Sequence, residues 1–550
     1  MKSLSFIVLI ALLILNARGQ SAITDVYNIG FRPQVDGFGF ENWGSSLRTS
    51  GVTAAEMQRM FGDRVFSSTA GGKSVLSPPA KVWMDEANKA MQFGHCEGMA
   101  VLCTLMYFHK IAPGTFGSSE TDRLSLSDEP LQREIAYWWV TQATSPGGSR
   151  KVKDSPNEVL DTLIKAFKDG RNATEWWTLG IYKPDGSGGH AITPFAVENF
   201  TNGTARILVY DNNFPKMTRA VAVDRRNNTW SYTASINPNK PSALYAGNAS
   251  TQTLEVVSIP PRLVPQRCDF CEDNTSASLN RTKGALAGQE RVQFWVDGNA
   301  SILVSDESGR RTGFVGPGQF VTEIPNSTAQ SLKYLNEPWT IDQAPVITVP
   351  QSANVSAKIT AVGMADPDLT AIGPNYVVQA QNLALNPGEE VVLTVTPSGN
   401  TINAVLSTPR TGPGMLGSSK TATLVVGVNT PAESFVFTIQ DAVIDVGGTL
   451  SLEFDPAQDA FTLEANGVKQ LTYTKANGIS GSAQVTLTVV QTDSATGEQT
   501  TSTYGGGTTG AEGEVSTGGP ATGTIPPPTP PEMGYHNGTS PTMSIIAYYI

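Results

Sequence analysis

The pattern of secondary-structure signals changes between residues 260 and 290, and this change most constrains what the chain can fold into. Before it, helical stretches are followed by alternating, strand-like stretches. Beyond it, short strand-like stretches recur and the helical pattern stops. Pro260-Pro261 and the polar segment 271–289 mark the junction. A chain of 550 residues divided in this way is expected to form several domains.

The first part of the chain carries two strong helix signals and two strand signals. Residues 97–110 are apolar throughout and predict a buried helix, and residues 157–168 show helical periodicity behind a Ser155-Pro156 start. Residues 190–197 and 206–210 predict two strands. Helices followed by antiparallel strands are typical of an α+β domain, which we place at residues 20–265.

The turn and the bulge between these two strands can also be predicted. Asn202-Gly203 has the composition of a turn that joins antiparallel strands. Pro194, inside the first strand, lacks the N–H that a strand ladder uses, so it predicts an edge position or a bulge.

The second part of the chain is expected to be all β. A linker with a C-x-x-C sequence, residues 266–290, precedes a small β module at 291–345. Residues 346–500 contain strand-like stretches at short spacings, typical of one or two β-sandwich domains. Residues 501–550 are rich in Gly, Thr and Pro and are expected to form a flexible tail.

The first nineteen residues have the pattern of an export signal. Lys2 precedes an unbroken apolar run at 6–15, and Ala17 and Gly19 place small residues before a cleavage point at Gln20. The run is shorter than the roughly 20 apolar residues that a membrane span needs. We therefore expect removal of residues 1–19, no transmembrane span afterwards, and an extracellular or cell-surface location. An uncleaved N-terminal anchor is the alternative.

Eleven Asn-x-Ser/Thr sequons agree with export and predict a glycoprotein in a host that glycosylates. They lie at Asn172, Asn199, Asn202, Asn227, Asn248, Asn274, Asn280, Asn299, Asn326, Asn354 and Asn537. The formal net charge of −11 argues against nucleic acid or an anionic membrane as a partner.

A candidate nucleophile stands at the start of the predicted buried helix. Gly94-His95-Cys96 leads into it, and the N-terminal end of a helix dipole favours a thiolate over a thiol. A nucleophilic cysteine also needs a base. His95 is adjacent in sequence and diverges from Cys96, His109 lies near the far end of the helix, and His536 lies in the predicted tail. His190, at the start of a strand, is therefore the candidate base.

The base must be oriented by a carboxylate or an amide. The strand at 206–210 ends in Asp211-Asn212 and, paired antiparallel, brings its end back beside His190. Either Asp211 or Asn212 fits this position, and alternation along the strand favours Asp211.

Three motifs together, "GHCEGMAVL", "GGHAITPFAVE" and "ILVYDNNFP", resemble the papain-like cysteine peptidase superfamily, and most closely its C39-type peptidase-like branch. The resemblance covers about residues 80 to 215. It implies Cys96 as nucleophile, His190 as base and Asp211 as the orienting residue. The superfamily also uses a Gln side chain to bind the oxyanion, usually six residues before the Cys. Position 90 is Ala here, and the nearest candidate is Gln92, four residues before Cys96.

The other cysteines predict structural roles. Cys103 lies two helical turns after Cys96, about 10 Å away, too far for a disulfide. Cys268 and Cys271 lack the further ligands that zinc needs, and a local disulfide is the simpler interpretation in an exported chain. We expect no cofactor and no metal.

These features predict a secreted thiol hydrolase that cleaves peptide or amide bonds through an acyl-enzyme. Its partner would be a peptide or protein substrate, or a cell-surface polymer. Two alternatives stay open. One is a catalytically silent papain-like domain in a surface or matrix protein, and the other is a transglutaminase-like acyl transferase, in which an amine resolves the same intermediate.

Overall fold

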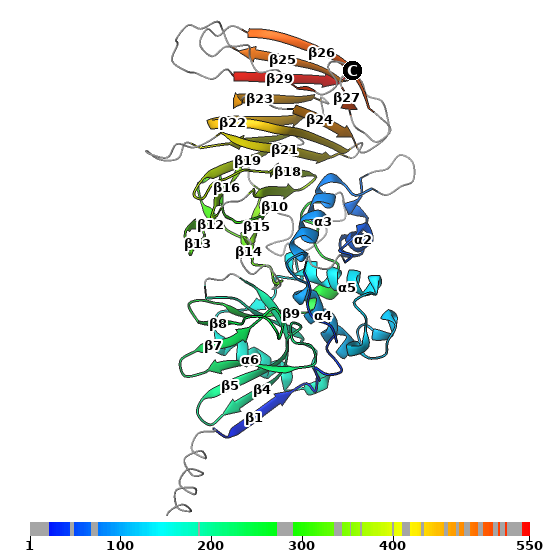
Figure 1. Ribbon diagram of the computed structural model, residues 1–550, viewed down its shortest axis with the longest axis vertical. Helices are drawn as coiled ribbons and strands as arrows, with labels where there is room; N and C mark the ends of the chain where they lie inside the picture. Colours follow the sequence, from blue (N-terminus) through cyan, green and yellow to red (C-terminus); the bar gives the residue numbers. More distant parts are fainter. Residues whose placement is uncertain are drawn as a thin grey trace, which may run out of the picture. The chain divides into compact units, whose positions relative to one another are not determined.

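A computed structural model of the chain is shown in Figure 1. It describes residues 21–44, 49–67, 75–184, 188–271, 290–334, 344–351, 354–363, 366–398, 401–409, 419–430, 434–455, 460–468, 472–477, 485–492, 499–509, 515–516, 523–524 and 542–549. The expected signal peptide, positions 272–289 of the expected linker and most of the expected tail lie outside these residues.

The chain folds into two compact units whose boundaries differ from the expected ones. The first unit comprises Met1–Ser50, Met91–Val264 and Lys333–Glu337, and the second comprises Gly51–Ala90, Pro265–Leu332 and Pro338–Ile550. Residues 51–90 thus belong to the second unit, although we expected them in the domain at 20–265. A short segment beginning at Lys333 belongs to the first unit. Together the units form a multidomain, strand-rich protein.

Aromatic packing explains why residues 51–90 belong to the second unit. They form α2 (Ala54–Phe61) and α3 (Pro78–Met91). The rings of Phe61 and Trp83 lie 5.2 and 5.6 Å from that of Phe270, and Trp83 also meets Trp295 at 6.3 Å. Burying these large rings together stabilises the helices on this unit.

The first unit is built on an antiparallel nine-stranded sheet in the order β2-β9-β3-β4-β5-β6-β7-β8, with β1 paired to β4. Its strands are β1 (Ile23–Asn28), β2 (Lys151–Val152), β3 (Trp177–Ile181), β4 (His190–Phe200), β5 (Thr204–Tyr210), β6 (Thr218–Asp224), β7 (Thr229–Ala234), β8 (Ala243–Asn248) and β9 (Leu254–Ser258).

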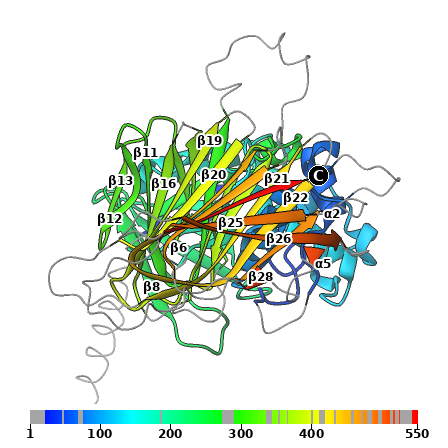
Figure 2. The same ribbon diagram turned by 90° about the horizontal axis from the view of Figure 1, so that it is seen from above.

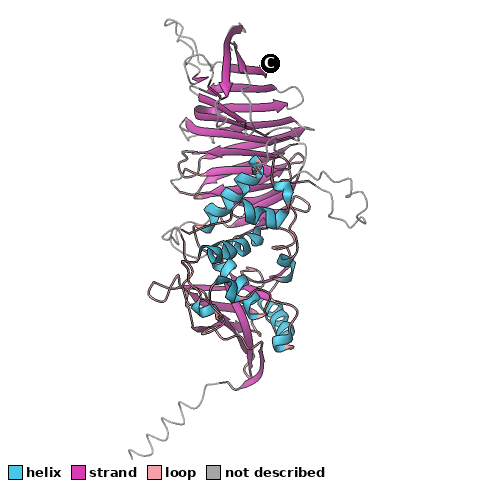
Figure 3. Cartoon of the chain, turned by 90° about the vertical axis from the view of Figure 1, so that its right-hand side faces the viewer, coloured by secondary structure: helices cyan, strands magenta, loops and turns pink. Residues whose placement is uncertain are grey.

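Among the described residues, three α-helices accompany this sheet, and two match the predicted ones. The three helices are α4 (Cys96–Tyr107), α5 (Glu129–Val140) and α6 (Pro156–Phe167). Figure 3 draws the helices of the chain in cyan and its strands in magenta. Every residue of α4 is buried, and α4 packs on α5 and β4. The Ser155 hydroxyl accepts the N–H of Glu158 at 3.2 Å and caps α6, as the sequence predicts.

The β4–β5 hairpin confirms the predicted turn and bulge. Gly203 adopts a φ of +79°, in the left-handed region that a turn residue needs. The register shifts between Pro194 and Ala196, so a bulge accommodates the proline within the sheet.

The second unit is all β beyond α3, in the residues that the structure describes. Its strands are β10 (Arg291–Asp297), β11 (Ala300–Asp306), β12 (Arg311–Gly316), β13 (Gln319–Thr322), β14 (Thr328–Gln330), β15 (Val346–Pro350), β16 (Val355–Ala361), β17 (Asp368–Gly373), β18 (Tyr376–Gln381), β19 (Glu390–Ser398), β20 (Thr401–Ser407), β21 (Lys420–Asn429), β22 (Ser434–Asp455), β23 (Ala460–Val468), β24 (Thr472–Asn477), β25 (Val485–Thr492), β26 (Gln499–Thr509), β27 (Val515–Ser516), β28 (Gly523–Thr524) and β29 (Thr542–Tyr549).

Strand pairing sorts nine of these strands into two ladders that both meet β22 (Figure 2). One ladder runs through β15, β10, β17, β18 and β21, and the other through β11, β16, β19 and β20. Every second residue of β11 and β16 is buried. The buried core takes residues from both ladders, among them Phe294 and Ile359, so the arrangement is sandwich-like.

One expectation for the C-terminal region differs from the structure. Residues 499–509 and 542–549 form strands where a flexible tail is expected, and β29 pairs with both β23 and β25. Ile545 and Ile546 give β29 the composition of a strand. Asn466-Gly467 resembles a hairpin turn in sequence, yet it lies inside β23, because pairing with β22 and β29 keeps that strand extended.

Within the residues that the structure describes, no helix is long and apolar enough to cross a membrane.

A core substitution should destabilise the second unit alone. Phe294 is fully buried in its core, so we expect Phe294→Ala to lower the unfolding free energy of this unit by about 3 to 5 kcal/mol. Phe320 is 39% exposed, and Phe320→Ala should cost less than about 1 kcal/mol. Calorimetry that resolves two transitions tests this, and a shift of both transitions in Phe294→Ala would contradict the division into two units.

Candidate functional site

Residues that come before α4 in the sequence fix the position of its first turn. The N–H of His95 donates to the side-chain oxygen of Asn42 at 2.7 Å, and the ring of His95 stacks on Trp43 with centroids 4.1 Å apart. Nδ1 of His95 lies 2.9 Å from the Trp43 carbonyl oxygen. Burial lowers the pKa of His95 to about 4, so this ring is neutral near pH 7. It anchors the turn that leads into Cys96.

Cys96 is the first residue of α4 and is completely buried. Its sulfur accepts the N–H of Ala191 at 3.3 Å, and the side chain packs with Ala100 and Ala191. Burial raises the pKa of the Cys96 thiol well above its usual range, an effect that the N–H of Ala191 only partly offsets. The sulfur is therefore a neutral thiol in this closed arrangement.

His190 and Asp211 are brought together as a buried pair. His190 opens β4 and Asp211 follows directly after β5, and the pairing of Thr193 with Tyr210 aligns the two strand ends. Nε2 of His190 lies 2.8 Å from Oδ1 of Asp211.

Further donors keep Asp211 ionised. The Tyr232 hydroxyl and the Asn213 N–H both donate to it. Burial raises the pKa of Asp211, but His190 and these two donors outweigh it, so the pKa lies below its usual value. The result is a carboxylate fixed against an imidazole.

Among the residues that the structure describes, the second nitrogen of this imidazole, Nδ1 of His190, is buried and makes no hydrogen bond. An unsatisfied buried nitrogen costs free energy, about 1 to 3 kcal/mol, and needs an explanation. The residue after His190, Ala191, donates its backbone N–H to the Cys96 sulfur at 3.3 Å.

Asn212 connects α4 with β4. Among the described residues, it makes no hydrogen bond to the imidazole of His190. Its side-chain amide donates to the carbonyl oxygens of Cys96 and Ala191, both at 3.0 Å. The sequence allowed either residue as the orienting group. Asp211 is the one that contacts the imidazole ring, and Asn212 connects α4 to β4.

Two amides are candidates for an oxyanion donor. Gln92 lies exposed in the turn between α3 and α4, with no hydrogen bond to the site recorded among the described residues. Asn42, which sequence reasoning missed, is buried and its amide donates to the carbonyl oxygen of Tyr334 at 3.0 Å. Nothing in the sequence around Asn42 marks it, because it reaches the site from a loop far upstream.

A buried charge cluster lies beside the thiol. Glu97, next to Cys96 in α4, forms a completely buried ion pair with Arg262. Nζ of Lys333 lies 3.5 Å from Glu97 and 3.0 Å from Glu255, and the Tyr182 hydroxyl donates to Glu255 at 2.8 Å. A lone carboxylate in an otherwise apolar helix is a sequence signal for such a cluster, since buried charges are paired.

Glu255 is ionised within this cluster. Burial raises its pKa, but Lys333 and Lys151, with hydrogen bonds from Lys333 and Tyr182, outweigh burial and lower the pKa to about 2. Glu255 thus stays a carboxylate over the whole physiological range.

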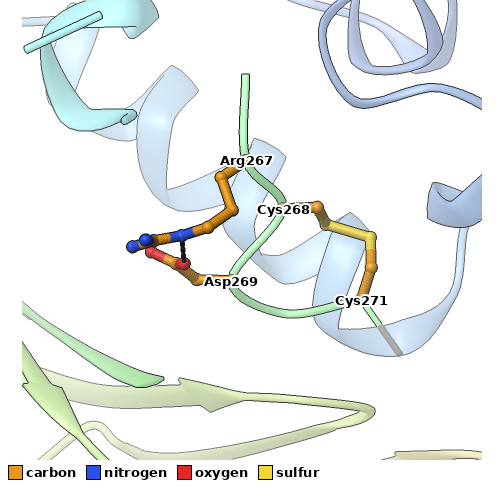
Figure 4. Close-up of a disulfide and its surroundings, with 4 residues drawn as sticks. All are labelled: Arg267, Cys268, Asp269 and Cys271. Atoms are coloured by element: carbon orange, nitrogen blue, oxygen red, sulfur yellow. Dashed lines mark hydrogen bonds and ion pairs between the residues drawn. A yellow bond between two sulfur atoms is a disulfide. The ribbon is translucent and has the colours of Figure 1, made fainter. Parts of the chain in front are cut away.

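The remaining cysteines have the expected structural character. Cys103 is buried, its sulfur lies 3.3 Å from the Thr193 hydroxyl, and burial raises its pKa to about 12. Cys268 and Cys271 form a disulfide with Cα atoms 5.3 Å apart, as predicted (Figure 4). Between them, Asp269 pairs with Arg267.

A surface hollow of about 950 Å³ lies elsewhere in the first unit. It is lined by Ala205, Val223 and Trp230 among others, from β5, β6 and β7, and includes none of Cys96, His190 or Asp211. In the described part of the chain, no group of three or more His, Cys, Asp or Glu side chains is placed to hold a metal ion.

Comparisons of the chain with protein-family models, with curated proteins and with solved structures found no match. The resemblance to papain-like peptidases therefore stays a prediction from three motifs. The chemistry of the site is inferred below from its own residues.

The lowered pKa of Glu255 predicts a specific acid sensitivity. Since the folded pKa is about 2 and the ordinary value is 4.5, Glu255 stabilises the fold above pH 4.5, and this stability is lost as the pH falls toward 2. The shift corresponds to about 3 kcal/mol. We expect Glu255→Gln to lower stability at pH 7 and to flatten its fall between pH 4.5 and 2.5, as measured by urea unfolding.

The matched control is Glu129→Gln, whose carboxylate is 61% exposed. It should leave the pH dependence almost unchanged. An equally steep acid transition in Glu255→Gln would show that other carboxylates govern it.

Proposed function

We propose that the first unit is a papain-like thiol hydrolase that cleaves peptide or amide bonds, with Cys96 as nucleophile, His190 as base and Asp211 as the orienting carboxylate. The observation that carries the proposal is the buried Asp211–His190 contact of 2.8 Å. Within the described residues, Nδ1 of His190 makes no hydrogen bond, and the residue after His190 donates its N–H to the Cys96 sulfur. Nucleophilic catalysis by a thiol requires a base of this kind, fixed by a carboxylate and with its second nitrogen available.

The reaction follows from these positions. His190 takes the proton of the Cys96 thiol, and the sulfur attacks the carbonyl carbon to form a tetrahedral adduct. The C–N bond breaks as His190 returns the proton to the leaving amine, which gives a thioester. Water then attacks the thioester and its proton passes to His190. The S–C bond breaks to release the acid, and His190 returns the proton to the Cys96 sulfur. Asp211 stabilises the imidazolium in both steps.

The oxyanion needs donors at the start of α4. The backbone N–H of Cys96 stands at the positive end of the helix dipole and supplies one. The second donor is a side-chain amide, and we consider Gln92 and Asn42. Asn42 has the stronger support, because its amide already donates to a peptide carbonyl and its oxygen holds the N–H of His95.

The remaining sequence features give this enzyme its setting. The signal pattern at 1–19 and the sequons support an exported glycoprotein at the cell surface or outside the cell. The sandwich-like second unit would hold the enzyme near a surface polymer or protein substrate. The papain-like fold of the first unit is part of the proposal.

A second candidate is a silent papain-like module, and one observation favours it. Cys96 is completely buried and burial raises the pKa of its thiol, so in the closed state the sulfur is neither charged nor accessible. An active enzyme must therefore open the site before it reacts.

A thiol-directed epoxide probe separates the two candidates. We expect the mature chain to be labelled at Cys96, and Cys96→Ala and His190→Ala to abolish this labelling. Asp211→Asn should slow it by about 10²- to 10⁴-fold, because the imidazole loses its orienting charge. Peptide mapping by mass spectrometry locates the label.

Cys103→Ser is the matched control, since Cys103 lies on the same helix and is equally buried. It should be labelled as fast as the unmodified chain. Labelling that persists in His190→Ala, or that falls equally on Cys103, would favour the silent module. An added primary amine that traps the acyl group would instead assign a transglutaminase-like transferase.

The oxyanion donor can be assigned by comparing two variants. We expect Asn42→Ala to lower the turnover rate of a peptide ester by about 10²- to 10³-fold, the usual effect of losing an oxyanion donor. Gln92→Ala should change it little, because Gln92 is exposed. The opposite ranking would return the role to Gln92.

A further inference from the structure

Lys333-Tyr334 is inserted among the residues of the candidate site, and its whole backbone is hydrogen-bonded there. The Lys333 N–H donates to Gln142 at 2.8 Å, and its carbonyl accepts from the Trp139 indole at 2.9 Å. The Tyr334 N–H donates to the carbonyl of Gly189 at 3.0 Å, and its carbonyl accepts from Asn42 at 3.0 Å. Capture of both N–H and C=O groups of an extended segment is how proteins bind peptides.

The two residues lie between the element that carries the sulfur and the element that carries the imidazole. Gly189 directly precedes His190, and Gly94 stands two residues before Cys96. A Cβ atom placed on Gly94 would lie 1.8 Å from the Tyr334 carbonyl oxygen, so only glycine lets this carbonyl approach. The Tyr334 carbonyl therefore lies against the turn that leads into Cys96.

The Lys333 side chain fills a pocket of its own. It is fully buried, with Nζ 3.0 Å from Glu255 and 3.5 Å from Glu97. A Cβ atom on Gly180 would lie 2.8 Å from Cγ of Glu255 and 3.1 Å from Cδ of Lys333, so the missing side chain makes room for both members of this ion pair. Tyr182, which donates to Glu255, completes the polar end of the pocket.

The cations of the cluster divide between its two carboxylates. Lys333 forms the ion pair with Glu255 at 3.0 Å, and Arg262 forms the one with Glu97. Lys151 also lowers the pKa of Glu255, though less than Lys333 does. A lysine side chain that entered here would therefore have to replace the ammonium of Lys333 beside Glu255.

We propose that Lys333-Tyr334 is an internal ligand of the peptide-binding cleft beside Cys96, and that the pocket of Glu97, Glu255 and Tyr182 recognises a lysine side chain of the substrate in its place. The substrate class is a peptide with lysine immediately before the residue whose carbonyl faces Cys96. This inference deepens the proposed function and rests on it.

The test uses the mature chain with Lys333→Met, which keeps the length of the stem and removes the charge. A fluorescent acetyl-Leu-Lys-Tyr-amide peptide and its norleucine analogue are compared by anisotropy in a Cys96→Ala background, so that binding is measured without reaction. We expect the lysine peptide to bind the Lys333→Met chain about 10- to 100-fold more tightly than the analogue, the range for a hydrogen bond to a charged group. Glu255→Gln should remove the preference.

The rate of Cys96 alkylation by iodoacetamide independently measures whether the Lys333-Tyr334 segment covers the thiol. With Cys96 present, we expect Lys333→Met to raise the rate of Cys96 alkylation at least tenfold and Lys333→Arg to raise it less, because arginine can still pair with Glu255. Cys103 serves as the internal control.

The outcomes separate this inference from the proposed function. Equal binding of the two peptides, with Cys96 still reactive and dependent on His190, would overturn the lysine pocket alone. Lysine-selective binding with an unreactive Cys96 would support the pocket and contradict the hydrolase. Loss of folding in both Lys333→Met and Lys333→Ala, seen by circular dichroism, would show a structural tie and overturn the proposal.

Discussion

The register between β4 and β5 decides whether the candidate site exists. Pairing of Thr193 with Tyr210 carries the chain that leaves β5 back past the first residues of β4. Asp211 then reaches the imidazole of His190, and Asn212 reaches the backbone of Ala191 and Cys96. A slip of one residue would turn both side chains to the opposite faces. The bulge at Pro194 separates this stretch from the rest of the hairpin, so the strand ends keep their own alignment.

Local signals in the sequence were sufficient to predict the helix and strands that hold the candidate site residues. They were insufficient to predict the residues that surround the site. The apolar run after Cys96, the proline in β4 and the turn at Gly203 each act within a few residues, and all three were predictable. Asn466-Gly467 has an equally local signal, yet pairing on both sides of β23 overrides it. Asn42 and Lys333 come from distant parts of the chain. Periodicity and spacing in a single sequence do not predict tertiary contacts of this kind.

Burial and reactivity are coupled in this site. Loss of solvent is the largest influence that raises the pKa of the Cys96 thiol, ahead of any neighbouring charge. The same dry surroundings strengthen the Asp211–His190 contact, because a charged hydrogen bond gains strength when water is excluded. In the hydrolase that we propose, substrate would have to enter and change these surroundings before Cys96 reacts. Asn42 connects the turn before Cys96 with the Lys333-Tyr334 segment, since it binds both the His95 N–H and the Tyr334 carbonyl.

The position of Lys333 is easier to explain by recognition than by stability. Removing an ammonium from water costs several kcal/mol, and a buried ion pair seldom improves on well-packed apolar groups. A tie that only joined this segment to the fold would be served by leucine or methionine. The ammonium provides selectivity instead, because the carboxylates at 3.0 and 3.5 Å bind a cationic side chain. An apolar side chain in the same place would leave Glu255 without this ion pair. In the exchange that we propose, a substrate lysine would restore the ion pair with Glu255, while Arg262 stays paired with Glu97.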